Sequence, residues 1–199
     1  MKTSKWLKCG LAAGALFAAQ SAPHAHIIIE DMQGRAGYNE MLTLIVPHGC
    51  GADPTTAVRM KVPEEITLVV PHPGDGWDVE IKKRKTDQPV MREGRPITEV
   101  VDEIVWSGNT LPSEELGLFK FMASVPRTPG KVLYFKTIQV CGEKEDRWVE
   151  THDNDEEYWR AWLLKAPAPF AVIVEPSKPQ LGVDMQTLAK ARAEMSGGE

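Results

Sequence analysis

Short runs in which apolar and polar residues alternate, separated by turns rich in proline and glycine, fill the chain between residues 26 and 150. A period of two turns one face of an extended segment toward a core and the other toward solvent. In residues 55–62, for example, Arg59 and Lys61 alternate with apolar side chains, and residues 119–125 repeat this alternation. Several short strands divided by turn residues predict an all-β sandwich or barrel.

The expected strands follow from these runs and from the turns that flank them. We predict strands at residues 26–30, 41–46, 55–62, 77–81, 101–106 and 119–125, and a hairpin made by residues 132–141 and 147–150. Residues 82–95 are polar, so we expect a solvated excursion there. The length of the chain suits one domain followed by a tail.

The composition changes after Thr151, where the tail begins. An acidic run at residues 153–157 leads into one or two helical turns at residues 158–165, and a proline-rich link follows. We expect a final edge strand at residues 170–175 and a short amphipathic helix at residues 183–195. The last four residues are expected to be disordered.

The first 25 residues have the pattern of a secretory signal. Lys2, Lys5 and Lys8 form a positive start, and residues 10–19 form an apolar stretch too short to span a bilayer. We therefore predict export to the periplasm, with no membrane span in the mature chain. The predicted plan is a signal peptide at residues 1–25, a β-sandwich domain at residues 26–151 and a C-terminal extension at residues 152–199.

The cleavage position decides the chemistry of the new N-terminus. Ala25 is a good last residue, whereas Pro23 is not the small residue usually found two positions earlier, so cleavage after Ala22 is the alternative. Cleavage after Ala25 would begin the mature protein with His26, whose α-amine and imidazole can together chelate a transition metal. Copper is the natural candidate for such nitrogen donors. Otherwise His24 and His26 are ordinary exposed residues near a terminus.

Two cysteines, Cys50 and Cys141, remain after the leader, because Cys9 would leave with it. In an oxidising compartment we expect them to form one disulfide, and a copper–thiolate site is the competing interpretation. The methionines are scattered, without the clustering expected of a soft Cu(I) site. Loss of a leader with three lysines and no acids changes the formal net charge from −5 to −8, which disfavours nucleic-acid binding.

The other residues with chemical potential favour structural interpretations. His48 shares a glycine-rich turn with Cys50 and is better explained as part of a disulfide anchor than as a metal ligand. His72 lies between two prolines, and His152 precedes the acidic run. Trp77 and Trp106 occupy core-facing strand positions and are expected to pack there. No glycine-rich phosphate loop or nucleophile-elbow motif occurs.

An ordered series of short motifs resembles one known family. After a histidine that opens an apolar strand come Gly37-Tyr38-Asn39-Glu40, Leu42-Thr43-Leu44-Ile45-Val46-Pro47, Pro54-Thr55-Thr56, Val62-Pro63-Glu64, Gly76-Trp77, Val105-Trp106-Ser107-Gly108, Gln139 and Trp148-Val149-Glu150. In this order they resemble the YcnI-like family of exported bacterial copper-binding domains, over about residues 26–150. The surroundings of Cys50 and Cys141 resemble the branch of that family that carries a disulfide.

The resemblance implies an immunoglobulin- or cupredoxin-like β-sandwich that holds Cu(II) in a brace made by one histidine. In this chain His26 would supply its amine and imidazole, Glu40 a carboxylate oxygen, and Trp148 would pack over the metal. Cu(II) favours a tetragonal set of nitrogen and oxygen donors, which water would complete. Without the resemblance, we would interpret Glu40 as a solvated carboxylate and Trp148 as a half-buried strand residue. Residues 82–95 and everything after Glu150 depart from the simplest members.

We therefore predict a periplasmic Cu(II)-binding protein, not an enzyme, that takes part in copper acquisition, delivery or tolerance. Its expected partners are the copper ion and other periplasmic or membrane copper-transport proteins. A copper oxygenase is one alternative, although such enzymes typically add a second histidine side chain, and His48, His72 and His152 lack a matching context. An exported interaction module is the other alternative, because Trp159 and Trp162 have no role in the copper interpretation.

Overall fold

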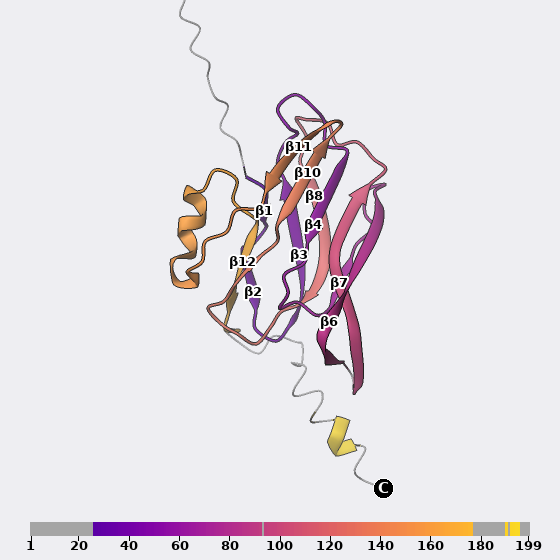
Figure 1. Ribbon diagram of the computed structural model, residues 1–199, viewed down its shortest axis with the longest axis vertical. Coiled ribbons are helices and arrows are strands. Elements are labelled where there is room, and N and C mark those ends of the chain that lie inside the picture. The colour runs from indigo at the N-terminus through magenta and orange to yellow at the C-terminus, as the bar shows by residue number, and fades with distance from the viewer. Residues whose placement is uncertain (1–25, 93, 177–189, 191, 196–199) are drawn as a thin grey trace, which may run out of the picture.

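The computed structural model describes residues 26–92, 94–176, 190 and 192–195, and it forms the all-β sandwich that the strand pattern predicts (Figure 1). The predicted signal peptide, with Cys9 and His24, lies outside the described residues. So does most of the helix predicted at residues 183–195, although residues 190 and 192–195 are helical. Within the described part, no helix is both long and apolar enough to cross a membrane.

Two antiparallel sheets form the layers of the sandwich, and a smaller sheet closes one side. The first has the order β1 (Ile28–Ile29), β3 (Asn39–Val46), β8 (Gly117–Ser124), β5 (Val69–Pro71). The second has the order β11 (Lys144–Trp148), β10 (Thr137–Cys141), β4 (Ala57–Lys61), β7 (Arg95–Ser107), β6 (Asp78–Arg92). The smaller sheet has the order β2 (Gln33–Arg35), β12 (Phe170–Val174), β9 (Val132–Tyr134).

The core lies between the two larger sheets and consists of their inward-facing side chains. Trp106 of β7 and Phe119 of β8 come from opposite sheets, and their ring centroids lie 5.5 Å apart. Phe121 and Phe135 lie at the same separation. Full burial of one large apolar side chain contributes about 1.5–3 kcal/mol, so the sheet-to-sheet packing supplies most of the driving force for the fold.

A long two-stranded ribbon occupies the segment that we expected to be a solvated excursion. β6 and β7 pair antiparallel, with register shifts after Lys82 and after Lys85, and the ribbon reaches past the other strands (Figure 1). The prediction for residues 82–95 is wrong because both faces of the ribbon are largely exposed there, so no apolar alternation marks the strands. Cross-strand ion pairs such as Lys82 with Glu103, 3.2 Å apart, accompany the main-chain pairing.

The chain after Thr151 packs against the sandwich. β12 lies between β2 and β9, so the predicted edge strand is wrong in its position: it is the central strand of the small sheet, and Ala171 and Ile173 join the main core. The expected helical turns form the 3₁₀ helix η1 (Asp155–Leu163). Figure 1 shows η1 on one side of the sandwich, next to β12 and β1.

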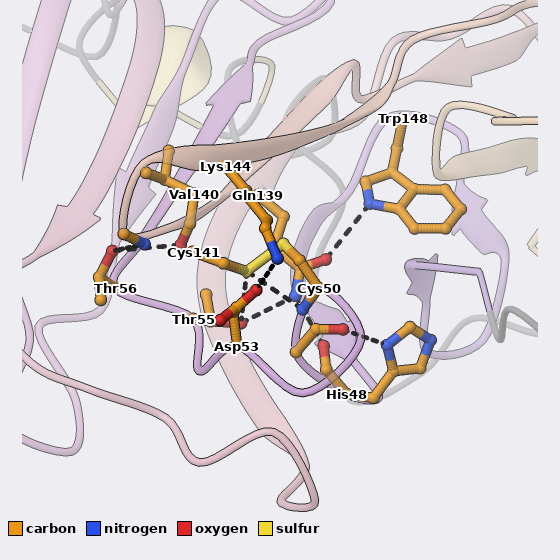
Figure 2. The surroundings of a disulfide bond; sticks show 12 residues. His48, Cys50, Asp53, Thr55, Thr56, Gln139, Val140, Cys141, Lys144 and Trp148 are labelled. Carbon is orange, nitrogen blue, oxygen red and sulfur yellow. Dashed lines mark hydrogen bonds and ion pairs between the residues drawn. A yellow bond between two sulfur atoms is a disulfide. The ribbon is translucent and has the colours of Figure 1, made fainter.

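The disulfide predicted from the cysteine count is present and joins Cys50 to Cys141. It links the loop after β3 to the end of β10 (Figure 2). The two cysteines are 91 residues apart in sequence, and closing a loop of that length contributes about 4 kcal/mol in the chain-entropy model. Because both sulfur atoms are engaged, the alternative of a copper–thiolate site at these residues is wrong.

Gln139 is fully buried beside the disulfide, and its side-chain amide is hydrogen-bonded on both sides (Figure 2). Its Nε2 donates to the carbonyl oxygen of His48 at 2.6 Å and to the hydroxyl of Thr55 at 2.8 Å. Its Oε1 accepts the indole N–H of Trp148 at 3.4 Å. A buried amide destabilises a fold unless it is hydrogen-bonded, so these contacts hold the loop after β3 against β10 and β11.

The Gln139→Leu variant should be less stable than the native protein by about 3 kcal/mol, because the buried partners at His48, Thr55 and Trp148 lose their hydrogen bonds. Urea unfolding with the disulfide intact measures this free energy. Ile138→Leu is the matched control, since the neighbouring side chain is half-buried and apolar, and it should change stability by less than about 1.5 kcal/mol. Equal stability of Gln139→Leu and the native protein would contradict the role of the amide.

Candidate functional site

His26 lies just before β1, and its imidazole contacts two indole rings. The ring centroids of His26 and Trp148 are 5.7 Å apart with an angle of 61° between the planes, an edge-to-face arrangement. The centroids of His26 and Trp162 are 5.9 Å apart with an angle of 16°, a stacked arrangement. Both separations are typical of direct aromatic contact. Two aromatic walls from distant parts of the chain therefore enclose a half-buried histidine.

Trp148 is held firmly at this position. It is the last residue of β11, pairs with Thr137 of β10, and is only 4% exposed. Its indole N–H is bound to Gln139, so the ring orientation is determined from both the main chain and the side chain. The structure thus brings His26 and Trp148 together, as the family resemblance implies. The position of Trp148 beside a metal stays a prediction.

His48 lies at the same end of the sandwich as His26. β1 and β3 pair antiparallel with Ile28 opposite Ile45, and continuing this register places His26 opposite the residue before His48. Gln139 links the His48 carbonyl to the Trp148 indole, which contacts His26. Figure 2 shows the His48 imidazole and the Trp148 indole on the same side of the disulfide. The loop that we interpreted only as a disulfide anchor therefore also places His48 at the same end of the sandwich as His26.

The structure does not bring Glu40 to His26, and the ligand pair implied by the resemblance requires correction. Glu40 starts β3, opposite Ala123, whereas His26 extends the pairing beyond the other end of β3. Ile45 lies five residue steps along β3 from Glu40, a distance of about 17 Å at the rise of an antiparallel strand. The Glu40 carboxylate instead accepts a hydrogen bond from Arg35, and this bond raises the pKa of Arg35.

The two remaining described histidines, His72 and His152, have other surroundings. His72 is exposed after β5. His152 lies beside a cleft of about 450 Å³, and its main-chain carbonyl accepts a hydrogen bond from the Tyr134 hydroxyl at 3.2 Å. Burial raises the pKa of Tyr134, and this effect outweighs the opposing hydrogen bond that the His152 main-chain N–H donates to the same hydroxyl at 3.4 Å. In the described residues, no group of three or more His, Cys, Asp or Glu side chains could hold a metal ion.

Sequence reasoning missed two features of this site. Trp162 was interpreted as part of a separate extension, because nothing local shows that η1 folds back onto β1. His48 was assigned to the disulfide turn, because the register of β1 against β3 is a tertiary property. A clue to Trp162 was present in the sequence, since Trp159 and Trp162 follow an acidic run and precede an apolar segment, the pattern of a short helix that packs against a core.

The fold is similar to a known architecture. It matches the crystal structure of an uncharacterized protein from Nocardia farcinica, described as having an immunoglobulin-like fold, with a TM-score of 0.52. The similarity covers 75% of this chain and 98% of that chain at 16% sequence identity, so it shows the fold alone. No curated protein matches the chain.

A family model extends the comparison to sequence. The model described as "Domain of unknown function (DUF1775)" matches residues 26–173, and the YcnI-like domains are members of the same family. The match begins at His26 and includes both η1 and most of β12, so η1, the arm that carries Trp162, lies inside the matched region. The family model covers well over half of the chain, and the protein therefore belongs to the DUF1775 family of domains.

Proposed function

We propose that this protein is exported to the periplasm and binds Cu(II) through the α-amine and the imidazole of His26, as a carrier in copper acquisition, delivery or tolerance. The main support is the position of His26 at the start of the family domain, between Trp148 and Trp162. Cleavage after Ala25 would give this residue two nitrogen donors, which suit Cu(II). The Cys50–Cys141 disulfide is of the kind that persists in oxidising compartments.

His48 is the best candidate for a third donor. Its Nδ1 lies 2.5 Å from the carbonyl oxygen of Gly49. If Nδ1 donates its proton to this carbonyl, Nε2 carries the lone pair, which is the usual arrangement in a metal-binding histidine. His48 thus takes the place that the resemblance gives to Glu40. An amine, two imidazoles and water would make a nitrogen-rich tetragonal set for Cu(II).

The two indoles support binding in a different way. The face of an aromatic ring attracts a cation, and apolar walls around a site limit the access of water. Trp148 is almost fully buried and hydrogen-bonded to Gln139, so it is suited to act as such a wall and not as a ligand. A protein that holds copper in this way and passes it to periplasmic or membrane copper-transport proteins needs no catalytic group.

A copper oxygenase is the second candidate, and the position of His48 favours it more than the sequence did. Enzymes that activate O₂ at an N-terminal histidine typically add a second histidine side chain, and His48 is now the residue that would supply it.

The α-amine of His26 should be essential for tight Cu(II) binding. Protein exported with its N-terminus confirmed by mass should bind one equivalent of Cu(II) and give a nitrogen-rich tetragonal signal in electron paramagnetic resonance. Protein whose α-amine is blocked by acetylation, and the His26→Ala variant, should bind more weakly by at least the roughly 10- to 100-fold typical of losing an outer-shell partner. Unchanged signal and affinity in both of these proteins would exclude the N-terminal chelate.

His48 and Glu40 should differ in their effect on the same titration. His48→Ala should weaken Cu(II) binding at least about tenfold and lower the number of coupled nitrogens in the spectrum. Glu40→Gln should leave Cu(II) affinity unchanged, because this carboxylate pairs with Arg35 at the opposite end of β3. The reverse result, with loss of affinity only in Glu40→Gln, would place the carboxylate at the metal.

Copper-loaded protein should show no reductant-dependent oxygen consumption above that of an equal amount of the His26→Ala variant with the same added copper. An oxygen electrode with ascorbate as the electron donor measures this rate. Sustained turnover that requires His26 would favour the oxygenase over the carrier.

A further inference from the structure

We infer that Trp162 is a positioning residue for the His26 chelate, supplying a second aromatic wall from η1. Its indole is nearly parallel to the His26 imidazole, with 16° between the planes and 5.9 Å between the centroids. Trp148 meets the same imidazole edge-on at 61°. Two rings in different orientations restrict both the tilt and the rotation of a third ring between them. This inference rests on the proposed function for the identity of the metal, but the stacking itself is a property of the metal-free protein.

The arm that carries Trp162 is anchored, so the wall is part of the fold. Ala161, the preceding residue, is completely buried in a small core cluster with Val132 of β9 and Phe170 of β12. The ring centroid of Trp162 lies 5.6 Å from that of Phe170, and Tyr158 contacts Phe170 from the preceding turn. Apolar contacts therefore hold η1 against the small sheet on the side that faces β1.

Polar contacts hold the arm at its N-terminal end. The Asn154 side chain accepts a hydrogen bond from the Glu156 main-chain N–H and caps η1. Asp155 accepts a bond from the Val132 N–H at 3.3 Å and also pairs with Lys131 at 3.4 Å. Asp155 of the acidic run thus links η1 to β9 and to the residue before it. This structural role accounts for Asp155 without assigning it to a metal.

Little space remains between the arm and the N-terminal strand. A small space of about 10 Å³ lies here, and it is lined by residues 27–29, Trp162 and residues 167–170. That volume is at the lower limit for one water molecule, so Trp162 and β1 lie close to each other across it. The Trp162 indole contacts both His26 and Phe170 and is 39% exposed.

The chemical consequence is preorganisation of a flexible terminal residue. A histidine at a chain end rotates about several bonds, and chelation requires the imidazole to turn so that one ring nitrogen and the α-amine face the same point. Ordering such a side chain in advance removes an entropic cost from metal binding. A stacked indole also favours an electron-poor partner, and an imidazole that donates to a metal is such a ring.

Trp159 in the same arm provides a matched control. It is 50% exposed, and its ring lies under the guanidinium of Arg160, 4.9 Å from the ring centroid. It has the same side chain as Trp162 and lies in the same 3₁₀ helix, but its ring contacts the guanidinium of Arg160.

The experiment uses the exported protein that begins at His26 and the variants Trp162→Ala, Trp162→Phe and Trp159→Ala. In metal-free protein, Trp162→Ala should shift the NMR resonances of the His26 ring protons, which lie against the indole face, and Trp159→Ala should not. Cu(II) affinity, measured by competition with a chelator, should fall about three- to tenfold in Trp162→Ala, the effect expected for loss of one aromatic stacking contact. Trp162→Phe should restore most of the affinity, and Trp159→Ala should match the native protein.

The outcomes separate this inference from the proposed function. Native protein that binds Cu(II) through the amine, together with Trp162→Ala of equal affinity and an identical paramagnetic spectrum, would overturn the role of Trp162 and leave the function standing. Native protein that does not bind Cu(II) would overturn both. Equal losses in Trp162→Ala and Trp159→Ala, with no rescue by phenylalanine, would show a general effect of the arm on stability and would also reject the specific role.

Discussion

The antiparallel pairing of β1 with β3 is the constraint on which the rest of the site depends. With Ile28 opposite Ile45, His26 can lie only at the end of the sandwich where β3 finishes. That register brings His26 to the loop after β3 and to the end of β11, and it separates His26 from everything at the start of β3. A shift by one residue would turn Ile27 and Ile29 from the core to the surface, so the core itself enforces the register.

The end of the sandwich where His26 lies is held together by a disulfide and by buried hydrogen bonds. The Cys50–Cys141 disulfide and the buried amide of Gln139 tie one loop to two strands, and the same amide orients the indole of Trp148. Such support would suit the metal site proposed for this end, because side chains held by a rigid scaffold lose little freedom on binding. The opposite end carries the Arg35–Glu40 ion pair and the exposed β6–β7 ribbon.

The segment after β11 forms η1 and then β12. Asn154 caps η1 at its N-terminal end, and β12 is the central strand of the small sheet. Phe170 connects the two, since it lies in β12 and contacts the aromatic residues of η1. The segment after β11 therefore contributes both to the core, through Ala171 and Ile173, and to the surroundings of His26, through Trp162.

Local pattern was sufficient for much of the fold. Alternating apolar residues in β4 and β8 identified strands with one buried face, and the pairing of Cys50 with Cys141 followed from the cysteine count. The exposed ribbon of β6 and β7 was not predictable in this way, since a strand with two solvated faces has no apolar period. The position of β12 between β2 and β9 was not predictable either, because an apolar run does not specify which strands pair with it.

The sequence by itself thus determined the fold class, the disulfide and the family motifs, and it led to the prediction that cleavage exposes His26. The tertiary structure alone decided which residues meet that histidine. The family resemblance placed both Trp148 and Glu40 beside His26, but only Trp148 contacts it, and Glu40 lies at the other end of β3. The resemblance did not include Trp162, which also contacts His26. The physical reason is that strand register and the return of η1 are set by the burial of whole faces, an energy summed over many residues that no single motif contains.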